Sequence, residues 1–325
     1  MAGKKVAVAV VGGGLAGAAA AEVLGRHGIG VLILDDNLHP GGQYLRGGRA
    51  AGVGWTDGVK RRGFELIDRL PRKFVEVRNR AEVLGIEPGF GLLVADGNGR
   101  ISTVEAEHVL LATGARERFI PFTGWTLPGV LAAGAVQLLI KQSGVLPARD
   151  TIVAGAGLFL GAVAGDIRKS GGGVPAVLDE APLRRRIPPP LLFADQLLKF
   201  AQGGMLLTRL LSAGTRMRHG TRIIAAGGDE RVRAVTAARV DRRGAVIPGS
   251  ETVFPASCLA VGFGFTANTE LAQLAGCRMV LDTALGGWVV PVKAEFETSV
   301  AGIYAAGEIT AVGGAAKSLA EGRLA

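Results

Sequence analysis

The feature that most constrains this chain is a pattern that its sequence contains twice. In residues 5–35, an apolar run, the glycine-rich turn GGGLAG, an alanine-rich stretch and a second apolar run lead to Asp35. Residues 151–180 repeat this order, with the turn GAGLFL and with Asp179 or Glu180 as the acid. Counted from the first glycine of each turn, Asp35 follows by 23 positions and Asp179 by 24. One glycine-rich turn is weak evidence, but two copies at nearly equal spacing predict two strand–helix–strand units that bind dinucleotides.

Each glycine of the first turn has a physical role in such a unit. Gly12 permits the tight turn, Gly14 lets backbone N–H groups approach a pyrophosphate, and Gly17 lets the helix pack close to the sheet. The helix N-terminus carries about half a positive charge toward the phosphates. Asp35, at the end of the second strand, is placed to accept hydrogen bonds from ribose hydroxyls.

Length and composition favour two packed domains. A single core stops growing at roughly 250–300 residues, and this chain has 325 residues, of which 48% are hydrophobic and 51 are glycines. This profile is typical of an α/β enzyme with many tight turns. The pattern further predicts helices at 64–70 and 191–212, the latter after Pro188-Pro189-Pro190, strands at 73–78, 81–87, 91–95, 101–105, 108–114, 221–225, 231–240, 257–261 and 303–308, and a last helix from about Ala315.

The formal net charge of +9 raises the question of nucleic-acid binding. The basic residues form short groups at 60–62, 72–73 and 184–186, and no aromatic residues interleave with them as a stacking platform requires. We therefore expect no nucleic-acid partner. These groups are either a solvated face or a docking surface for an acidic partner protein or an anionic cofactor.

The N-terminus has two interpretations. Lys4-Lys5 and the apolar run that follows resemble a secretory signal. However, the three glycines of the first turn would loosen a signal helix, and the segment leads directly into the strand at 31–34. The run is also too short and too rich in glycine for a membrane span. We expect a soluble, cytoplasmic protein, with any association at the inner membrane peripheral and through partners.

Further motifs carry a resemblance to a known family. They are Gly41-Gly42-Gln43, the strand position Val83, Ala112-Thr113-Gly114, and the late run Gly302-Ile303-Tyr304-Ala305-Ala306-Gly307-Glu308, which Thr298 precedes. Together with the first glycine turn, they resemble the two-dinucleotide-binding-domain flavoproteins, the superfamily of thioredoxin reductase, over almost the whole chain. This resemblance implies that the first unit binds FAD.

The resemblance also implies roles for the early motifs. Gly42 and Gln43 lie in a loop that contacts the flavin, and the strand backbone at Val83 meets the adenine. Thr113 and Gly114 belong to the turn that returns the chain between domains.

In the late motif, the resemblance implies that the acid after Gly307 binds the ribityl chain. This acid is Glu308, where many relatives have aspartate. A helix that begins at Gly314 and Ala315 would then start near the flavin pyrimidine edge. Its positive end would stabilise the anionic reduced flavin, unless the helix serves packing alone.

Cysteine usage excludes dithiol chemistry. Thioredoxin reductases carry a CxxC pair before the second glycine turn, and other disulfide reductases carry one near the first flavin loop. Neither 41–51 nor 129–143 contains a cysteine, so no thiolate is available for exchange. We expect Cys258 and Cys277 to be core residues of a reduced, intracellular protein without a metal site. The four histidines lack an obvious carboxylate partner in the sequence, and we expect them to be structural: His27, His39, His108 and His219.

A narrower resemblance is carried by the segments 112–118, 121–130, 262–271, 285–288 and 307–310. They are similar to the FAD/NAD-type subunit of multi-subunit amino- and imino-acid dehydrogenases. This group includes opine oxidases, hydroxyproline dehydrogenases and hydrogen cyanide synthase, with the sarcosine oxidase alpha chain as a relative. In such complexes a second flavin subunit oxidises the C–N bond. We therefore expect no catalytic side chain here, because the chemistry is centred on the flavin.

The second glycine turn predicts a second nucleotide site. Gly155 and Gly157 match the first two glycines, but Leu160 replaces the third, and this bulk would push the helix from the sheet and alter binding. An acid at Asp179 or Glu180 favours an unphosphorylated ribose. The expected ligand is therefore NAD or another adenine nucleotide, rather than NADP.

We thus expect an α/β protein with two Rossmann-like, three-layer β/β/α dinucleotide-binding domains. Residues 1–117 and 263–325 form the FAD domain, and 118–262 form an inserted NAD-like domain. The expected function is the FAD-containing electron-transfer subunit of an opine- or hydroxyproline-type dehydrogenase. The alternatives are a free-standing NAD(P)H-dependent flavin reductase of a quinone or ferredoxin-like acceptor, and a non-catalytic nucleotide-binding scaffold.

The resemblance implies two partners. One is the catalytic flavin subunit that oxidises the amine. Many relatives also continue into a cysteine-rich segment that holds a [2Fe–2S] cluster, which the present sequence lacks after its last predicted helix. The cluster is therefore expected in a separate small subunit or nowhere in the complex.

Overall fold

The computed structural model describes residues 5–46, 58–182 and 214–325. These residues form two compact units. Unit 1 combines the chain up to Arg116 with Phe265–Ala325, and unit 2 contains Glu117–Gly264. The chain leaves unit 1 along β7 (Ala115–Glu117) and returns along β16 (Phe265–Ala267), and these two strands pair with each other.

Unit 1 is built on a sheet with the strand order β3-β2-β1-β6-β5-β4, in which β19 also pairs with β6. Its strands are β1 Val6–Val11, β2 Val31–Asp35, β3 Val75–Asn79, β4 Glu82–Ile86, β5 Gly91–Ala95, β6 Ile101–Leu111 and β19 Ile303–Ala305. β3, β2, β1, β6 and β19 are parallel, whereas β4 and β5 continue antiparallel from the first half of β6. The strands predicted at 101–105 and 108–114 are therefore one long strand that serves both parts of the sheet.

Alternate residues of β1 face two different layers, as the period of two in a strand requires. Ala9 packs in one apolar cluster with Leu92 of the antiparallel strands. Val10 packs in another cluster with Ala20 of helix α1 (Leu15–Arg26). The antiparallel strands, the parallel sheet and the helix thus form the predicted three-layer β/β/α arrangement.

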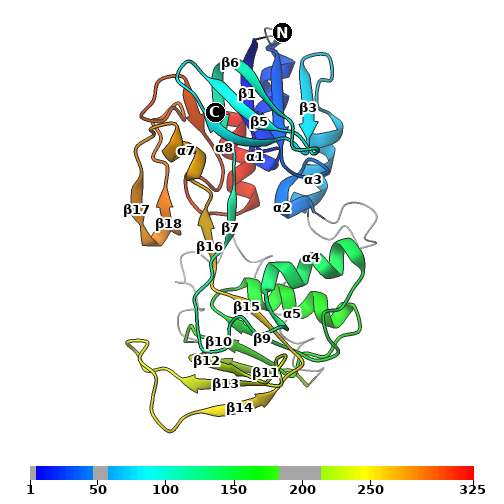
Figure 1. Cartoon of the computed structure of the whole chain (residues 1–325), viewed down its shortest axis with the longest axis vertical. Helices are drawn as coiled ribbons and strands as arrows, with labels where there is room; N and C mark the ends of the chain where they lie inside the picture. The colour runs from blue at the N-terminus through cyan, green and yellow to red at the C-terminus, as the bar shows by residue number, and fades with distance from the viewer. Residues whose placement is uncertain (1–4, 47–57, 183–213) are drawn as a thin grey trace. The chain divides into compact units, whose positions relative to one another are not determined.

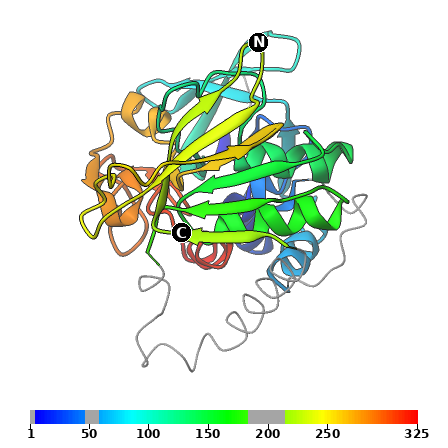
Figure 2. The ribbon, with the colours of Figure 1, turned by 90° about the horizontal axis from the view of Figure 1, so that it is seen from below.

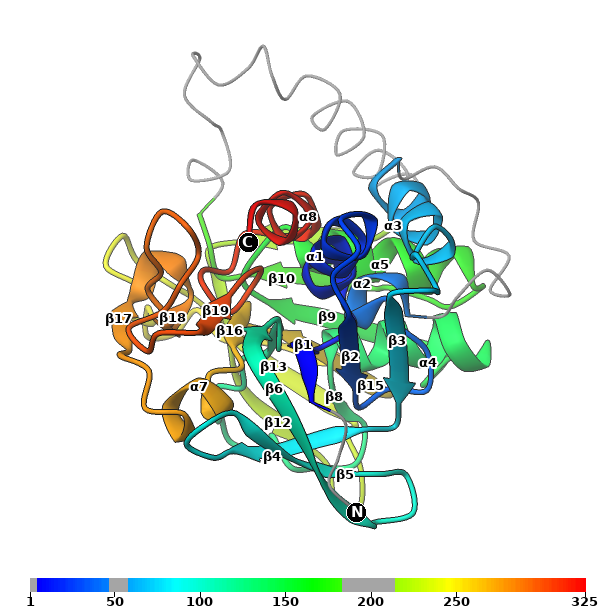
Figure 3. The same cartoon turned by 90° about the horizontal axis from the view of Figure 1, so that it is seen from above.

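Helix α8 (Ala315–Leu324) lies beside α1 in unit 1 (Figures 1 and 3). The two helices approach closely because small residues meet at their contact. A Cβ placed at Gly322 would lie only 2.1 Å from the carbonyl oxygen of Ala16. The first and the last helix of the chain are therefore neighbours. Two further helices belong to this unit: α2 Gly42–Leu45 and α3 Gly58–Asp68.

Unit 2 repeats the architecture with a parallel sheet in the order β11-β10-β9-β15-β8. The antiparallel strands β12, β13 and β14 form a separate meander. Its elements are β8 Val130–Ala132, α4 Ala133–Ser143, β9 Thr151–Gly155, α5 Phe159–Lys169, β10 Ala176–Asp179, β11 Arg216–His219, β12 Thr221–Gly227, β13 Ala234–Arg239, β14 Thr252–Pro255 and β15 Cys258–Gly262.

The two faces of this sheet are covered differently. Ile152 packs toward the meander with Val235, whereas Val153 packs toward the helices with Val163. Figure 1 shows α4 and α5 on one side of the sheet and the meander on the other. Viewed from the meander side in Figure 2, the yellow strands lie in front of the green sheet. Both units thus have the fold predicted from the repeated pattern.

Several elements differ from the sequence expectation. Helix α3 begins at Gly58, before the predicted residue 64, and β8 and α4 add a strand and a helix that were not predicted. α4 escaped prediction because its N-cap, Ala132, provides no side-chain cap. The returning part of unit 1 adds α7 Glu270–Leu274, β17 Val280–Asp282, η5 Thr283–Leu285 and β18 Gly287–Val289. The predicted helix at 191–212, the three prolines before it and the basic group at 184–186 lie outside the described residues.

Candidate functional site

The first glycine turn has the geometry of a phosphate-binding turn. Gly12 has a φ of +104°, and a Cβ there would lie 2.3 Å from the carbonyl oxygen of Ala112. A Cβ at Gly17 would lie 2.0 Å from the carbonyl oxygen of Gly12. Both positions therefore require glycine, and the second lets α1 start directly over the end of β1.

The N-terminus of α1 is open to a ligand. Gly14 is the N-cap, no side chain of the described residues caps it, and the first turn contains no acid. Its first N–H groups therefore have no intrahelical partner and attract anions. A Cβ at Gly14 would meet only the Cα of Gly42, at 3.9 Å. This cradle fits the pyrophosphate of a dinucleotide.

The Gly41-Gly42-Gln43 loop lies against this turn. The Gly41 N–H donates a hydrogen bond to the Gly13 carbonyl at 2.7 Å. Gly42 has a φ of +60°, and its Cβ would lie 3.0 Å from the Cα of Gly14. Gln43 is exposed in α2. The predicted flavin-contacting loop is therefore positioned by backbone contacts with the predicted pyrophosphate turn.

The Ala112-Thr113-Gly114 turn follows β6 and is held by Asn268. The Thr113 hydroxyl donates to the Asn268 carbonyl at 2.6 Å, and the Asn268 side-chain amide donates to the Thr113 carbonyl at 2.9 Å. The Asn268 N–H donates to the Gly114 carbonyl at 2.9 Å. A Cβ at Gly114 would meet no atom within 4 Å, so its surface is accessible. Asn268 therefore positions this turn, a role that the sequence motif did not reveal.

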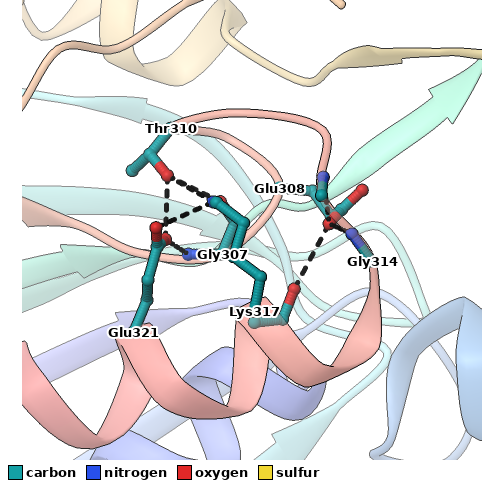
Figure 4. A network of polar contacts seen from close by, with 8 residues as sticks. Gly307, Glu308, Thr310, Gly314, Lys317 and Glu321 are labelled. Atoms are coloured by element: carbon teal, nitrogen blue, oxygen red, sulfur yellow. Dashed lines mark hydrogen bonds and ion pairs between the residues drawn. The ribbon is translucent and has the colours of Figure 1, made fainter. Parts of the chain in front are cut away.

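The late motif brings the far end of the chain to α1. Gly307 has a φ of +88°, and a Cβ there would lie 2.8 Å from the Cβ of Ala16. Glu308 lies over the start of α8, where one of its oxygens accepts hydrogen bonds from the N–H groups of Gly313 (3.1 Å) and Gly314 (2.6 Å; Figure 4). A Cβ at Gly314 would meet no atom within 4 Å. The predicted ribityl-binding acid and helix start, Glu308 and Gly314-Ala315, therefore lie together.

A polar network supports this motif from behind (Figure 4). The Glu321 carboxylate accepts hydrogen bonds from the Gly307 N–H and the Thr310 hydroxyl, both at 2.8 Å. The Lys317 amine forms an ion pair with Glu321 at 2.9 Å and donates to the Gly307 carbonyl at 2.9 Å. These contacts fix the turn between β19 and α8, which carries Glu308.

Asp35 is satisfied by its own chain. The residue is buried, with 3% of its surface exposed. One oxygen accepts the Gly13 N–H at 2.5 Å, and the other accepts the backbone and side-chain N–H groups of Asn37 at 2.8 and 2.9 Å. Asp35 thus holds the glycine turn in shape.

The neighbouring Asp36 was not singled out from the sequence. Its side chain is exposed directly after β2. Partial desolvation, followed by the negative charge of Asp35, raises the pKa of Asp36. The signal in the sequence was the doubled acid at 35–36, of which only the first was considered.

Val83 lies near the start of β4, and its side chain belongs to the core of unit 1. The predicted adenine contact at this position therefore concerns its backbone only.

The second glycine turn differs in how it packs. Gly155 has a φ of +134°, and its Cβ would lie 2.0 Å from the Gly262 carbonyl oxygen. Gly157 has a φ of +122° and open space around it. Leu160 is buried, and the space for its side chain exists because residue 262 is glycine, whose Cβ would lie 3.3 Å from Leu160 Cδ2. A small residue on β15 thus accommodates the bulk on α5.

The two acids after β10 have different environments. Asp179 is buried, accepts the Ala181 N–H at 3.1 Å, and lies 3.2 Å from Nδ1 of His219. His219 therefore has a carboxylate partner that its sequence neighbourhood did not suggest. Glu180 forms an ion pair with Arg222 and lines a cleft that also includes Ala156.

The predicted character of the cysteines is confirmed. Cys258 and Cys277 are buried, and burial raises the pKa of the Cys258 thiol to about 11. Burial also raises the pKa of Cys277. They belong to different units, in β15 of unit 2 and after α7 of unit 1.

Two further surveys concern the described ranges only. Within them, no group of three or more His, Cys, Asp or Glu side chains is arranged to hold a metal ion. None of the helices described here has the length and apolar character needed to cross a bilayer.

Comparisons with known proteins agree with the motifs. Residues 6–322 match the family described as pyridine nucleotide-disulphide oxidoreductase. The chain is 36% identical over 275 residues to the HcnB component of hydrogen cyanide synthase from Pseudomonas aeruginosa, covering 82% of this chain and 58% of that component. It is 32% identical over 340 residues to the OoxA-type component of opine oxidase, its first-lettered subunit, from Agrobacterium tumefaciens, covering 97% of this chain and 63% of that component. The chain thus spans about six tenths of the length of these relatives.

Solved structures show the same fold. Thioredoxin reductase from T. acidophilum has a TM-score of 0.73 at 19% identity, covering 99% of this chain and 96% of that chain. L-proline dehydrogenase from P. horikoshii has a TM-score of 0.68 at 19% identity, covering 98% of this chain and 53% of that chain. The resemblance predicted from the motifs is confirmed, and the chain belongs to the pyridine nucleotide-disulphide oxidoreductase family.

Proposed function

We propose that this chain is the FAD-containing electron-transfer subunit of a multi-subunit amino- or imino-acid dehydrogenase. The observation that carries the proposal is the convergence, within unit 1, of the glycine turn, the Gly41-Gly42-Gln43 loop and the segment around Glu308. Together they present two helix N-termini and an acid around accessible backbone at Gly14 and Gly314. This arrangement fits a long molecule with a central diphosphate and a polyol.

In this proposal the N-terminus of α1 binds the diphosphate, and Asp36 accepts hydrogen bonds from the ribose. Glu308 orients the ribityl chain, and the start of α8 places positive potential at the pyrimidine edge. When bound, FAD supplies reversible two-electron chemistry, and the protein supplies grip and electrostatics. No side chain of this chain abstracts a proton from the substrate.

The proposal for a complex rests on relatives whose printed names describe subunits. They belong to opine oxidase, hydrogen cyanide synthase and sarcosine oxidase. The absence of a CxxC pair in the sequence supports it further, because dithiol exchange, the chemistry of the disulfide reductases, requires that pair. We propose that the partner that oxidises the amine is a catalytic flavin subunit.

The test is reduction of the bound flavin in the full chain, with and without the co-expressed partner. We expect bleaching of the yellow absorbance by an amine substrate only when the partner is present, and little bleaching by NADH alone. Rapid bleaching by NADH without a partner would instead establish the second candidate, a free-standing NAD(P)H-dependent flavin reductase. This alternative is favoured by one observation, the complete second nucleotide-binding fold in unit 2. A colourless protein, after refolding with excess FAD, would reject both and leave a scaffold.

The flavin site itself is tested by Glu308→Gln. We expect about a tenfold loss of FAD affinity, because a charge-assisted hydrogen bond becomes a neutral one. Glu295→Gln, on an exposed residue of the same unit, is the matched control and should leave FAD affinity unchanged. Equal affinity in both variants would contradict the role of Glu308.

A small [2Fe–2S] subunit is the proposed second partner, and the complex is proposed to be cytoplasmic, with peripheral attachment to the inner membrane through partners. Iron and sulfide analysis of the gently purified complex tests the first point. Fractionation of cells with and without the partner genes tests the second.

A further inference from the structure

Unit 2 contains a cleft of about 290 Å³ at the end of β10. Its lining includes Ala156 of the second glycine turn, Glu180, Arg222 and the turn at 240–244. In a dinucleotide-binding unit, the acid after the second strand lies beside the adenosine ribose. The cleft is therefore at the place where the adenosine end of a nucleotide would bind, which rests on the proposed nucleotide-binding role of unit 2.

The charge of this cleft differs from what the acid alone predicts. Glu180 is engaged in an ion pair with Arg222. Arg242 and Arg243 also line the cleft, and among the described residues neither has an ion pair or a side-chain hydrogen bond. Three guanidinium groups thus meet two carboxylates, those of Glu180 and Asp241. The cleft has an excess of positive charge.

The turn that carries the two arginines is held in shape. One oxygen of Asp241 accepts hydrogen bonds from the N–H groups of Arg243 and Ala245, both at 2.8 Å. Val240 and Val246 form an antiparallel bridge across the base of the turn. The Asp241 charge is therefore used inside the turn, and the arginines project from a defined backbone.

We propose that this cleft binds an adenosine whose ribose carries a phosphomonoester. Such a group has a charge of about −1.5 to −2 near pH 7 and accepts charge-assisted hydrogen bonds from guanidinium groups. A neutral ribose hydroxyl would use Glu180 alone and leave the two arginines without a partner. The 2′-phosphate of NADP and the 3′-phosphate of coenzyme A share this chemistry.

The experiment is calorimetric titration of the FAD-loaded full chain with three probes: adenosine 2′,5′-bisphosphate, adenosine 3′,5′-bisphosphate and 5′-AMP. We expect one bisphosphate to bind about tenfold or more tightly than 5′-AMP, because one extra charge-assisted contact is worth about that factor. The better bisphosphate identifies the source of the phosphomonoester. Equal affinity for all three probes, or no binding of any, overturns the proposal.

Variants locate the effect. Arg242→Ala with Arg243→Ala should abolish the preference for the bisphosphate, while Arg231→Ala, an exposed arginine that does not line the cleft, should preserve it. Glu180→Gln should strengthen bisphosphate binding, because a repelling charge is removed. If the ribose were unphosphorylated, the same change would weaken 5′-AMP binding, and this opposite sign would overturn the proposal.

The flavin absorbance of the same samples separates the two proposals. Loss of phosphomonoester selectivity with retained flavin and partner-dependent reduction rejects only the inference about the cleft. Failure to retain flavin rejects the proposed function instead.

Discussion

Gly14 and Gly17 are three positions apart on the same turn, yet a methyl group at each meets different surroundings. At Gly17 it would lie 2.0 Å from a backbone oxygen, whereas at Gly14 its nearest neighbour is 3.9 Å away. Gly17 is thus required by the fold, and Gly14 is required only if a ligand approaches its backbone.

We therefore expect Gly17→Ala to destabilise unit 1 by about 1–3 kcal/mol, because the helix must move away from the strand. Gly14→Ala should keep the stability of the apoprotein but lose most of its flavin affinity. Thermal unfolding of the apoproteins and flavin titration measure the two effects. Unchanged flavin affinity in Gly14→Ala would contradict the pyrophosphate site.

The doubled acid at 35–36 predicts a similar separation. Asp35→Asn replaces an acceptor by a donor opposite buried N–H groups, which should cost about 1–3 kcal/mol of stability. Asp36→Asn should leave stability unchanged and lower FAD affinity, because its exposed carboxylate is the one available to a ribose. Chemical denaturation and flavin titration of both variants test this. The reverse pattern would restore Asp35 as the ribose-binding acid.

Glu117 gives unit 2 a pH-dependent term. Its two oxygens accept the Gly134 N–H at 2.9 Å near the start of α4. Burial raises the pKa of Glu117, and the N–H groups of Gly134 and Ala135 oppose this. The folded state therefore holds a proton at pH values where the unfolded state has lost it, so this term lowers stability as pH rises through that window.

Glu117→Gln removes the term. We expect its Tm relative to the wild type to be higher at pH 7 than at pH 4, by less than about 4 °C, the shift that 1 kcal/mol produces in a domain of this size. Calorimetry at both pH values checks the sign. A variant that loses stability at pH 7 would show that hydrogen bonding to the charged carboxylate outweighs its desolvation.

At this scale the sequence predicted part of the site. The glycines follow from backbone geometry that no other residue can adopt, so Gly12, Gly17 and Gly307 could be found from spacing and resemblance. The environment of Asp35 and the Asp179–His219 contact could not, because they depend on side-chain directions and on strands that are distant in sequence.

Among the elements, the pair α1 and α8 gives the clearest prediction. Gly322→Ala should push the helices apart, because its Cβ would lie 2.1 Å from a backbone oxygen of α1. We expect a loss of about 1–3 kcal/mol in stability and weaker flavin binding, since Glu308 is positioned by α8. Ala320→Ser, on an exposed residue of the same helix, is the control for thermal unfolding and flavin titration.

The elements also show what sequence patterns can and cannot supply. The two strand–helix–strand units were predictable because their strands are continuous apolar runs beside glycine turns. By contrast, β6 was divided into two strands because its middle, exposed on one face, interrupts the apolar pattern. α4 was missed because it lacks a capping signal, and its role as a further crossover is set by the parallel pairing of β8 with β15.

On the scale of the whole molecule, the two thiols make one functional prediction. Because both cysteines are buried and the pKa of Cys258 is about 11, neither is a reactive thiolate at neutral pH. Native holoprotein should therefore react slowly with thiol reagents and keep its flavin reduction by the partner complex after treatment. Mass spectrometry and flavin reduction rates measure this. Fast inactivation would indicate thiol chemistry.

The contact of the first helix with the last has a consequence for biosynthesis. Gly12–Gly17 leave the ribosome before unit 2 does, whereas Glu308 and α8 follow it. A nascent chain therefore holds only half of the flavin cradle while unit 2 can already fold. We expect cofactor loading to wait until α8 has emerged, as the step that closes the first domain.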